Sequence, residues 1–289
     1  RLLKGVPKSR IYRIIRKGEV RVNEGRVKPH TRLQSGDMLR VPPVRVGDKG
    51  GSRDRKMEEY IEKTILYESK VMLIINKPEG VAVHGGSGIS AGIIESLRQA
   101  RPHDSHLELV HRLDRGTSGC LMIAKRRSYL KLLQAELQRK TGLKKIYAAI
   151  AHGSWPRRKQ HIKAPIARNI LRSGERVSRV QPGGKECHTE IRSLACDGRF
   201  SILEAMPITG RTHQIRVHCR HAGYPVVGDD KYGFDDADRS LRDRGLRRMM
   251  LHASRLEIPA LGEHPPVQVD APLDGQMRQL IDEIKTGKQ

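Results

Sequence analysis

Aromatic residues are scarce in this chain, since Phe, Trp and Tyr make up 3% of its 289 residues. Proteins that hold single-stranded nucleic acid by stacking bases on side-chain rings need more of them. Any affinity for such a partner must therefore depend on charge and shape. Acidic residues are also outnumbered, with 32 Asp and Glu against 56 Lys and Arg, so the formal net charge is +24. This excess favours a polyanionic partner, because binding would release its condensed counterions.

Cysteines are few and long apolar runs are lacking. The four cysteines, Cys120, Cys187, Cys196 and Cys219, include no C-x-x-C pair, so the sequence signals neither a zinc knuckle nor a redox pair, and we expect no disulfides. The sequence shows no signal peptide, no run of 18 apolar residues and no long amphipathic helix typical of a membrane surface. The cytoplasm is the expected location. The chain begins with Arg1 instead of Met, which predicts that the native chain starts earlier.

Residues 1–46 are predicted to form a small basic module. Residues 1–49 hold 14 Lys and Arg against 4 Asp and Glu, a net charge of +10. A helix is expected from Arg10 to Lys17, capped by Ser9 and ended by Gly18, with its isoleucines on one face. Short strands are expected at 20–22 and 38–41. The helix cations predicted to bind RNA lie largely off the apolar face, and a merely solvated face is the alternative; they are Arg10, Arg13, Arg16 and Lys17.

This module resembles a known RNA-binding domain. The segments that carry the resemblance are Lys8-Ser9-Arg10, Gly18-x-Val20-x-Val22-Asn23, Lys28-Pro29 and Gly36-Asp37, and they look like the S4 domain. The first helix of an S4 domain is missing from the pattern. Residues 47–60 are predicted to be a flexible linker, because residues 47–56 contain three glycines and no apolar residue.

Residues 61–289 are predicted to form a second, larger domain. Apolar runs indicate strands at 71–75, 120–124, 145–151, 200–205 and 215–217, and helices are expected at 93–100 and about 128–140. Strands and helices do not alternate regularly, so the predicted fold class is α+β.

The segment His111-Arg112-Leu113-Asp114-Arg115-Gly116-Thr117-Ser118-Gly119 is the strongest chemical signal. It joins two apolar runs, so it is expected to be a loop that leads into a buried strand. An aspartate between two arginines should stay ionised, because nearby cations lower its pKa. An accessible carboxylate of this kind suits a nucleophile or a base. A structural Arg-Asp-Arg ion pair is the alternative.

A second polar segment is Thr209-Gly210-Arg211-Thr212-His213-Gln214-Ile215-Arg216-Val217-His218. Polar and apolar residues alternate in it as on a strand, and an arginine there can hold a carboxylate or a phosphate with two bonds. His213, His218 and His221 raise a metal site as an alternative, but no carboxylate completes a familiar ligand set, so we predict no metal.

Together with Lys145-Ile146-Tyr147-Ala148-Ala149, these two segments resemble the pseudouridine synthases of the RluA/RluC type. The resemblance implies that Asp114 is the nucleophile, that Tyr147 lies against the target base and takes its C5 proton, and that Arg211 pairs with Asp114. It also implies that Arg112 fills the gap left by a flipped uridine. Whether Asp114 attacks the sugar or assists glycal formation stays open. Without the resemblance, Tyr147 would equally suit a place in a core.

The resemblance implies an S4-like module linked to an α+β catalytic domain with a central mixed, largely antiparallel sheet. The expected activity is that of an isomerase that flips uridines of 23S ribosomal RNA and converts them to pseudouridine. The reaction needs no outside atom, so we expect no cofactor, and we expect a monomer with large-subunit ribosomal RNA as partner and no membrane. The alternatives are a sister synthase acting on transfer RNA or another ribosomal site, and a non-catalytic S4-type assembly factor. The predicted Asp114 argues against the assembly factor, because a protein that only binds RNA does not need a carboxylate placed among the anionic phosphates.

Overall fold

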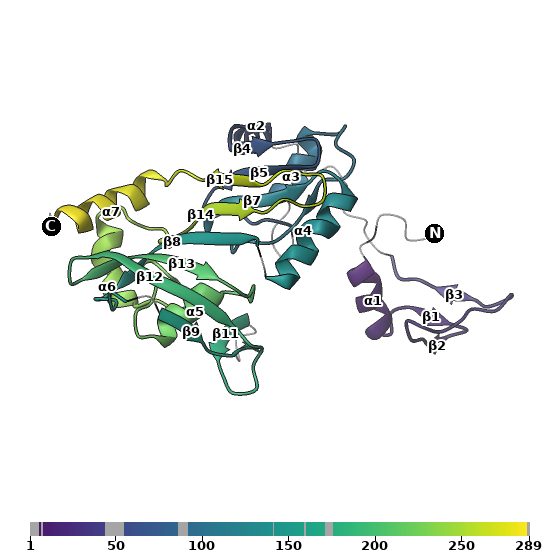
Figure 1. Ribbon diagram of the computed structural model, residues 1–289. Coiled ribbons are helices and arrows are strands. Elements are labelled where there is room, and N and C mark those ends of the chain that lie inside the picture. The colour runs from purple at the N-terminus through teal and green to yellow at the C-terminus, as the bar shows by residue number, and fades with distance from the viewer. Residues whose placement is uncertain are drawn as a thin grey trace. The chain divides into compact units, whose positions relative to one another are not determined.

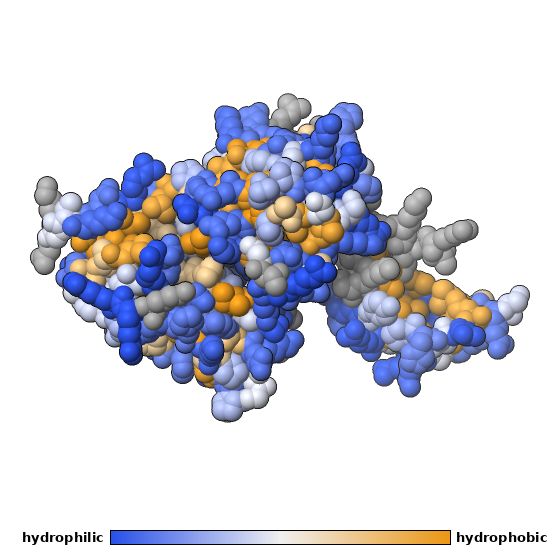
Figure 2. Space-filling view, in the orientation of Figure 1, coloured by the Kyte–Doolittle hydropathy of each residue, from blue (hydrophilic) through white to orange (hydrophobic). Residues whose placement is uncertain are grey.

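The chain forms two compact units, residues 1–53 and 54–289. Their ribbons are drawn in Figure 1, a computed structural model that describes residues 6, 8–43, 55–85, 92–140, 142–158, 160–170 and 176–287. None of the helices in those ranges is long and apolar enough to cross a membrane. On the face shown in Figure 2, hydrophilic residues cover most of both units, as the net charge of +24 leads one to expect.

The first unit contains one amphipathic helix and three short strands. Helix α1 (Lys8–Arg16) buries Ile14 and exposes Arg13 and Arg16, and Lys17 directly after it is exposed as well, which confirms the predicted separation of apolar and basic faces. The side chain of Arg10 lies outside the described residues. The helix begins at Lys8, so Ser9 lies inside it and is not the predicted cap. The three strands form an antiparallel sheet in the order β2-β1-β3; they are β1 (Arg21–Val22), β2 (Gly25–Arg26) and β3 (Leu39–Arg40).

The second unit is built on a ten-stranded sheet. Its main path runs β4-β5-β7-β14-β8-β13-β12-β9, with β15 paired to β14 and β6 paired to β7. Among the strand pairs that the structure describes in this sheet, β7–β14 is parallel and the rest are antiparallel, which confirms the predicted α+β fold with a mixed, largely antiparallel sheet. The strands are β4 (Ile65–Glu68), β5 (Met72–Lys77), β6 (Glu108–Leu109), β7 (Ser118–Ala124), β8 (Lys144–His152), β9 (Gln160–Lys163), β12 (His188–Cys196), β13 (Phe200–Pro207), β14 (Leu251–Ile258) and β15 (Val267–Asp270). A separate hairpin pairs β10 (Ile166–Ile170) with β11 (Arg176–Val180).

Helices pack against this sheet at several places (Figure 1). Helices α2 and α3 pack against each other, α4 contacts β7, α5 contacts β11, β12 and β13, and α7 contacts β12 and β13. Their bounds are α2 (Arg55–Lys63), α3 (Ile93–Ala100), α4 (Arg127–Arg139), α5 (Gln214–His221), α6 (Asp235–Asp243) and α7 (Gly275–Thr286). Helix α2 takes in residues 55–60 of the predicted linker, because Met57 and the fully buried Ile61, four residues apart, pack on the core.

The centre of the sheet is apolar and closely packed. All seven residues of β7 are buried, in agreement with the apolar run from which this strand was expected. Gly119 has φ +105°, and a Cβ on it would lie 2.3 Å from the carbonyl oxygen of Ala253. Only glycine therefore permits β7 to approach β14 at this point, directly after the loop that carries Asp114.

The prediction of a strand at 215–217 is wrong, because these residues lie in helix α5. Residues 214–219 are all buried, including the polar ones. The helix therefore presents no polar face in this stretch, and its sequence carries no helical period that would separate it from a buried strand.

Candidate active site

Asp114 lies in the loop between β6 and β7, as the sequence predicts. The N–H of Thr117 donates to the carbonyl of Asp114 (3.1 Å) and closes a tight turn. At the start of the loop, Nε2 of His111 accepts the N–H of Met122 in β7 (3.1 Å). Burial lowers the pKa of His111 to about 3, so its ring stays neutral and can accept this bond. The Asp114 side chain is 20% exposed, which leaves it accessible at the end of a fixed loop.

A buried lysine also fixes this loop through hydrogen bonds to backbone carbonyls. Nζ of Lys77 donates to the carbonyls of Pro78 (2.6 Å), Val81 (2.8 Å) and Arg115 (3.2 Å). The backbones of Gly80 and Arg115 are joined by an N–H···O bond of 2.9 Å, and Nε of Arg115 donates to the Gly80 carbonyl. Burial lowers the pKa of Lys77 to about 7. These bonds fix the residue that follows Asp114, so the carboxylate starts from one backbone position.

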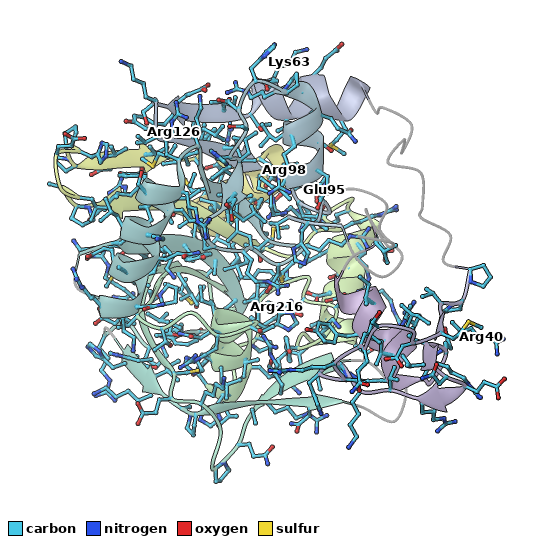
Figure 3. The ribbon with its side chains drawn as sticks, turned by 90° about the vertical axis from the view of Figure 1, so that its right-hand side faces the viewer. Arg40, Lys63, Glu95, Arg98, Arg126 and Arg216 are labelled. Atoms are coloured by element: carbon cyan, nitrogen blue, oxygen red, sulfur yellow. The ribbon has the colours of Figure 1, made fainter. Side chains whose placement is uncertain are left out.

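The cation that faces Asp114 is Arg216 of α5. Its Nη1 lies 3.5 Å from Oδ2 of Asp114. The guanidinium is fixed by Asp229, which accepts Nε (2.7 Å) and Nη2 (2.6 Å) with its two oxygens, and Nη2 also lies 3.2 Å from Oδ1 of Asp230. Burial disfavours the charge of Arg216, but the bonds to Asp229 and the nearby carboxylates hold its pKa above the ordinary value. Figure 3 shows Arg216 within the second unit.

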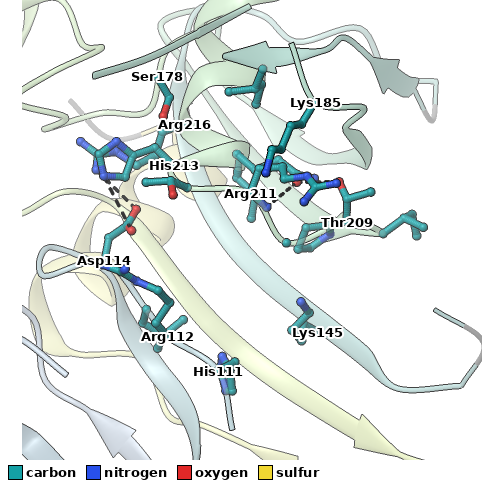
Figure 4. Close-up of a pocket in the computed structure, with 18 of the residues that line it drawn as sticks. His111, Arg112, Asp114, Lys145, Ser178, Lys185, Thr209, Arg211, His213 and Arg216 are labelled. Carbon is teal, nitrogen blue, oxygen red and sulfur yellow. Dashed lines mark hydrogen bonds and ion pairs between the residues drawn. The ribbon is translucent and has the colours of Figure 1, made fainter. Parts of the chain in front are cut away.

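The predicted pair of Asp114 and Arg211 is therefore wrong. Arg211 is exposed, and its Nε donates weakly to the carbonyl of Glu186 (3.4 Å). It lies with Lys185 and Thr209 on the other side of the pocket from Asp114 (Figure 4). Asp114, Arg112, Tyr147 and Arg211 nevertheless line one cavity of about 890 Å³. The structure thus brings together the residues predicted for the second unit, with Arg216 in the pairing role.

Tyr147 stands on β8 and is 8% exposed. Burial, and to a lesser extent the charge of Asp114, raises the pKa of Tyr147 above its ordinary range. Its hydroxyl is therefore protonated at neutral pH. Two residues earlier on the same face of β8, Lys145 also lines the cavity, and burial lowers its pKa.

The cavity is strongly basic. Among its described lining residues Asp114 is the one acid, and the lining cations besides Arg216 are Arg112, Lys140, Lys145, Arg168, Lys185 and Arg211. A cavity of this size admits a nucleotide-sized ligand, and its cations suit a phosphate backbone around the reacting group. The same cations would give a neutral or cationic substrate no such attraction.

Two of the three histidines considered for a metal have other partners. Nδ1 of His218 contacts the Thr189 hydroxyl (2.8 Å) and its Nε2 donates to the Ala164 carbonyl (3.0 Å), so both ring nitrogens are used in the core. His213 contacts Tyr232 (2.8 Å) and faces Asp114 (3.8 Å). Among the described residues, the side chains that could hold a metal ion are instead His161, His188 and Glu190.

Reasoning from sequence missed Arg216, Asp229 and Tyr232. The available signal was the segment Asp229-Asp230-x-Tyr232-Gly233, whose two adjacent acids are unusual in so basic a chain. Acids in such a setting need cationic partners, and Arg216 is the buried one. The fold and the site together suit an enzyme for a polyanionic substrate, because a carboxylate opposite an arginine and a buried tyrosine line one basic cavity.

Comparison with known proteins agrees with this class. Residues 71–221 match the RNA pseudouridylate synthase family and residues 1–39 match the S4 domain. A "Ribosomal large subunit pseudouridine synthase C" of Yersinia pestis is 48% identical over 284 residues, covering 96% of this chain and 88% of that protein. The protein of the same name from Pasteurella multocida (strain Pm70) is 48% identical over 291 residues, covering 99% and 88%.

The fold is also found among solved structures. "Human RNA Pseudouridylate Synthase Domain Containing 4" aligns with a TM-score of 0.65 and 24% identity over 80% of this chain and 96% of that chain. This likeness bears on the fold alone. On the family match and the relatives together, the chain belongs to the RNA pseudouridylate synthases, which are isomerases, and it carries an N-terminal S4 domain.

Proposed function

We propose that the protein converts uridines of large-subunit ribosomal RNA to pseudouridine. The observation that carries this proposal is Asp114, the one acid among the described lining residues of a basic cavity, held opposite Arg216. Relatives that are 48% identical over nearly the whole chain carry a name that specifies the ribosomal large subunit, and this supports the choice of substrate. The isomerisation rearranges bonds within one nucleotide, so we propose that it needs no small-molecule cofactor. We also propose that the protein acts as a monomer in the cytoplasm.

In the proposed reaction the target uridine first leaves its stack and enters the cavity, because no side chain reaches it inside a helix. Arg112, which is exposed at the cavity rim, takes the place that the base vacates. The C1′–N1 bond then breaks with Asp114 acting on the ribose, the uracil turns, and C1′ bonds to C5. The C5 proton must leave at the end to restore the aromatic ring.

Tyr147 is the proposed acceptor of the C5 proton, with one constraint. Because its pKa is raised, the hydroxyl is not a phenolate at neutral pH. It can take the proton only while passing its own to another base. Asp114 lines the same cavity and its charge acts on Tyr147, so we assign the second step of this transfer to Asp114.

The test is release of tritium from large-subunit ribosomal RNA labelled at C5 of uridine, with labelled transfer RNA in parallel. The full chain should release tritium from the ribosomal RNA and not from the transfer RNA. Asp114→Asn should release none while still binding the RNA, since Asn keeps the size but not the charge. Release by the Asn variant within tenfold of the wild type would refute the role of Asp114, and release from transfer RNA alone would refute the substrate.

A further inference from the structure

His213 adopts an uncommon backbone conformation next to Asp114. It has φ +56° and ψ +23°, in the left-handed region that residues other than glycine rarely adopt. It directly precedes helix α5, so the turn and the helix together fix its ring in the cavity (Figure 4). Conformations of this kind persist where the surroundings hold them, and they gather at functional sites.

The hydrogen bonds of Tyr232 favour one tautomer of His213. The backbone N–H of Ser178 donates to the hydroxyl oxygen of Tyr232 (2.9 Å). The hydroxyl keeps its own hydrogen, which it can donate to Nδ1 of His213 at 2.8 Å. Nδ1 is then the acceptor, so the neutral ring carries its proton on Nε2. Burial lowers the pKa of His213, which agrees with a neutral ring.

Nε2 is also the nitrogen that faces Asp114. It lies 3.8 Å from Oδ1, while Nη1 of Arg216 lies 3.5 Å from Oδ2, so the two carboxylate oxygens face different nitrogen atoms. Both distances exceed those of short hydrogen bonds, as is common before a substrate fills a site. We propose that Tyr232 sets the tautomer of His213 and that His213 thereby positions the Asp114 carboxylate for reaction. This inference deepens the proposed function and its kinetic part rests on it.

The first test is spectroscopic and needs no activity. In the full chain labelled with ¹⁵N-histidine, the NMR shifts of the His213 ring nitrogens, assigned with His213→Gln, should show a protonated Nε2 and a bare Nδ1. Tyr232→Phe keeps the ring, which lies 5.0 Å from Cζ of Arg216, but removes the hydroxyl. It should yield a mixture of both tautomers. A protonated Nδ1 in the wild type would overturn the inference.

The second test is kinetic. Tyr232→Phe should lower the single-turnover rate at saturating RNA by at least about tenfold, as loss of a tautomer-fixing partner does in other sites, with unchanged RNA affinity. Tyr129→Phe is the matched control, because Tyr129 is a buried tyrosine that packs on His264 and does not line the cavity. An unchanged rate in Tyr232→Phe would refute the inference alone, whereas an inactive wild type would refute the proposed function and leave the NMR result standing.

The third test separates the donor from the backbone. Gln at position 213 can place an N–H near the position of Nε2, whereas Asn is too short to do so. Asn, however, tolerates the left-handed conformation better than Gln. If the donor matters, His213→Gln should retain more activity than His213→Asn although the backbone favours Asn. Equal activities, or a more active Asn variant, would contradict the positioning role.

A separate observation concerns one face of strands β9 and β12. His161 is paired with Glu190 across the two strands, and His188 stands two residues from Glu190 on β12. Because side chains alternate along a strand, all three point to the same face. Nδ1 of His161 lies 3.2 Å from Nε2 of His188 and 3.6 Å from Oε1 of Glu190.

These separations suit a transition-metal ion. Zinc binds imidazole nitrogen at about 2.0–2.1 Å with tetrahedral angles, which places two such nitrogens roughly 3.4 Å apart. The geometry points to a site for a divalent ion such as Zn²⁺ or Co²⁺, with two imidazoles, one carboxylate and a fourth position left for water. The ion would take the place of the proton between the two histidines. It would tie β9, the last strand on the main path of the sheet, to β12.

The site has a structural consequence near the cavity. The carbonyl of His188 accepts the N–H groups of Ile208 (3.0 Å) and Thr209 (3.4 Å), and Nε2 of Gln214 (3.0 Å). His188 thus anchors the segment that carries Arg211 and His213. A metal on its ring would stiffen that anchor without touching the reacting groups.

The experiment uses Co²⁺ and Zn²⁺ on the full chain after treatment with a chelator. Co²⁺ should give visible absorption bands of a four-coordinate ion, and calorimetry with Zn²⁺ should give one site. His161→Ala and Glu190→Gln should each weaken Zn²⁺ binding by more than the roughly 10- to 100-fold that loss of an outer partner costs. His103→Ala, at an exposed histidine elsewhere, should leave it unchanged. No binding, or binding that neither ligand substitution weakens, would overturn the site.

Discussion

At Asp114 one carboxylate oxygen faces His213 and the other faces the guanidinium of Arg216. Arg216→Lys should strongly lower the rate, because Lys keeps the charge but loses the fork that Asp229 and Asp114 share. It should cost less stability than the roughly 3–5 kcal/mol lost when one partner of a buried pair is removed. Single-turnover rates and thermal melts measure the two effects.

Arg211→Lys is the matched control for that substitution. Arg211 is exposed, donates weakly to the Glu186 carbonyl and interacts with Cys187, but it is not paired with Asp114. Lys should therefore keep most of the rate and show its effect in RNA affinity. If Arg211→Lys abolished the rate while Arg216→Lys did not, the pairing assigned to Arg216 would have no catalytic consequence.

Tyr147→Phe should stop or greatly slow product formation with little loss of stability. The ring still packs beside Ala205 in the neighbouring strand, but the hydroxyl that we propose to pass on the C5 proton is gone. The measurement is pseudouridine content after single turnover, with a circular dichroism melt beside it. A variant with wild-type turnover would assign Tyr147 to the core only.

Motifs located Asp114, Tyr147 and the cavity-lining Arg211, but they did not identify the partner of Asp114. Arg211 and Arg216 are five residues apart, and on the strand expected there they would point to opposite faces. In the structure Arg211 precedes the helix and Arg216 lies in its first turns, so the two side chains leave different elements. The pairing depends on where the helix begins, which the sequence alone does not show.

At the scale of elements, a network of mostly buried polar side chains joins β7, β14 and α7 next to the loop that carries Asp114. The Ser118 hydroxyl donates to Nδ1 of His252 (2.7 Å) and accepts Nη2 of Arg248 (2.8 Å). Nε2 of His252 donates to the Ala271 carbonyl (3.2 Å), and Arg248 is paired with Asp274, the N-cap of α7. Nδ1 can accept only while the ring is neutral. The element packing therefore depends on the protonation of one histidine.

This dependence gives a prediction for pH. Burial lowers the pKa of His252 from its ordinary 6.5 to about 4. Between these values the unfolded chain binds a proton that the folded chain does not, so the free energy of unfolding falls as the pH drops from 6.5 towards 4. At 1.36 kcal/mol per unit the loss is at most roughly 3 kcal/mol. It is complete once the pH is below 4.

The measurement is the thermal midpoint at pH 7 and at pH 4.5 and constant ionic strength. His252→Gln should start lower and fall less on acidification, because the amide does not titrate. A variant whose midpoint falls as far as that of the wild type would show that other groups, such as the buried His111, account for the acid sensitivity.

The elements that could be predicted from the sequence are those whose apolar residues lie on one face or form an unbroken run. Helix α1 separates Ile14 from its cations, and β7 is an unbroken apolar run. Helix α5 was taken for a strand because burial of Arg216 and His218 removes its polar face. Those two side chains are satisfied by Asp229 and Thr189, which are distant in sequence, so the cause of the helix lies in tertiary contacts.

For the whole molecule, the uneven distribution of charge between the two units is the dominant feature. Residues 1–53 hold 15 Lys and Arg against 4 Asp and Glu, a net charge of +11 out of +24. The first unit has no described part in the cavity, which is lined by residues 111–251. We therefore expect its exposed cations at α1 to contribute affinity for RNA, and the second unit to contribute both affinity and chemistry.

Deleting residues 1–53 should weaken RNA binding more than it harms the reaction. The second unit keeps its own core and every proposed catalytic residue. Each phosphate that the protein no longer neutralises should lower the slope of log K against log salt by about 0.7–0.9. The truncated chain should therefore bind ribosomal RNA more weakly and with a shallower salt dependence. Its single-turnover rate at saturating RNA should fall far less than its affinity.

Filter binding at several salt concentrations, beside single-turnover tritium release, measures both quantities. The full chain with Arg13, Arg16 and Lys17 replaced by Ala is the matched variant, because it removes exposed cations in and directly after α1 and keeps the unit. It should reproduce part of the change in slope. An unchanged slope in both proteins would make the basic helix a solvated face. A greatly reduced saturated rate with unchanged binding in the truncated chain would mean that the first unit shapes the active site, because binding and chemistry would then have been assigned to the wrong units.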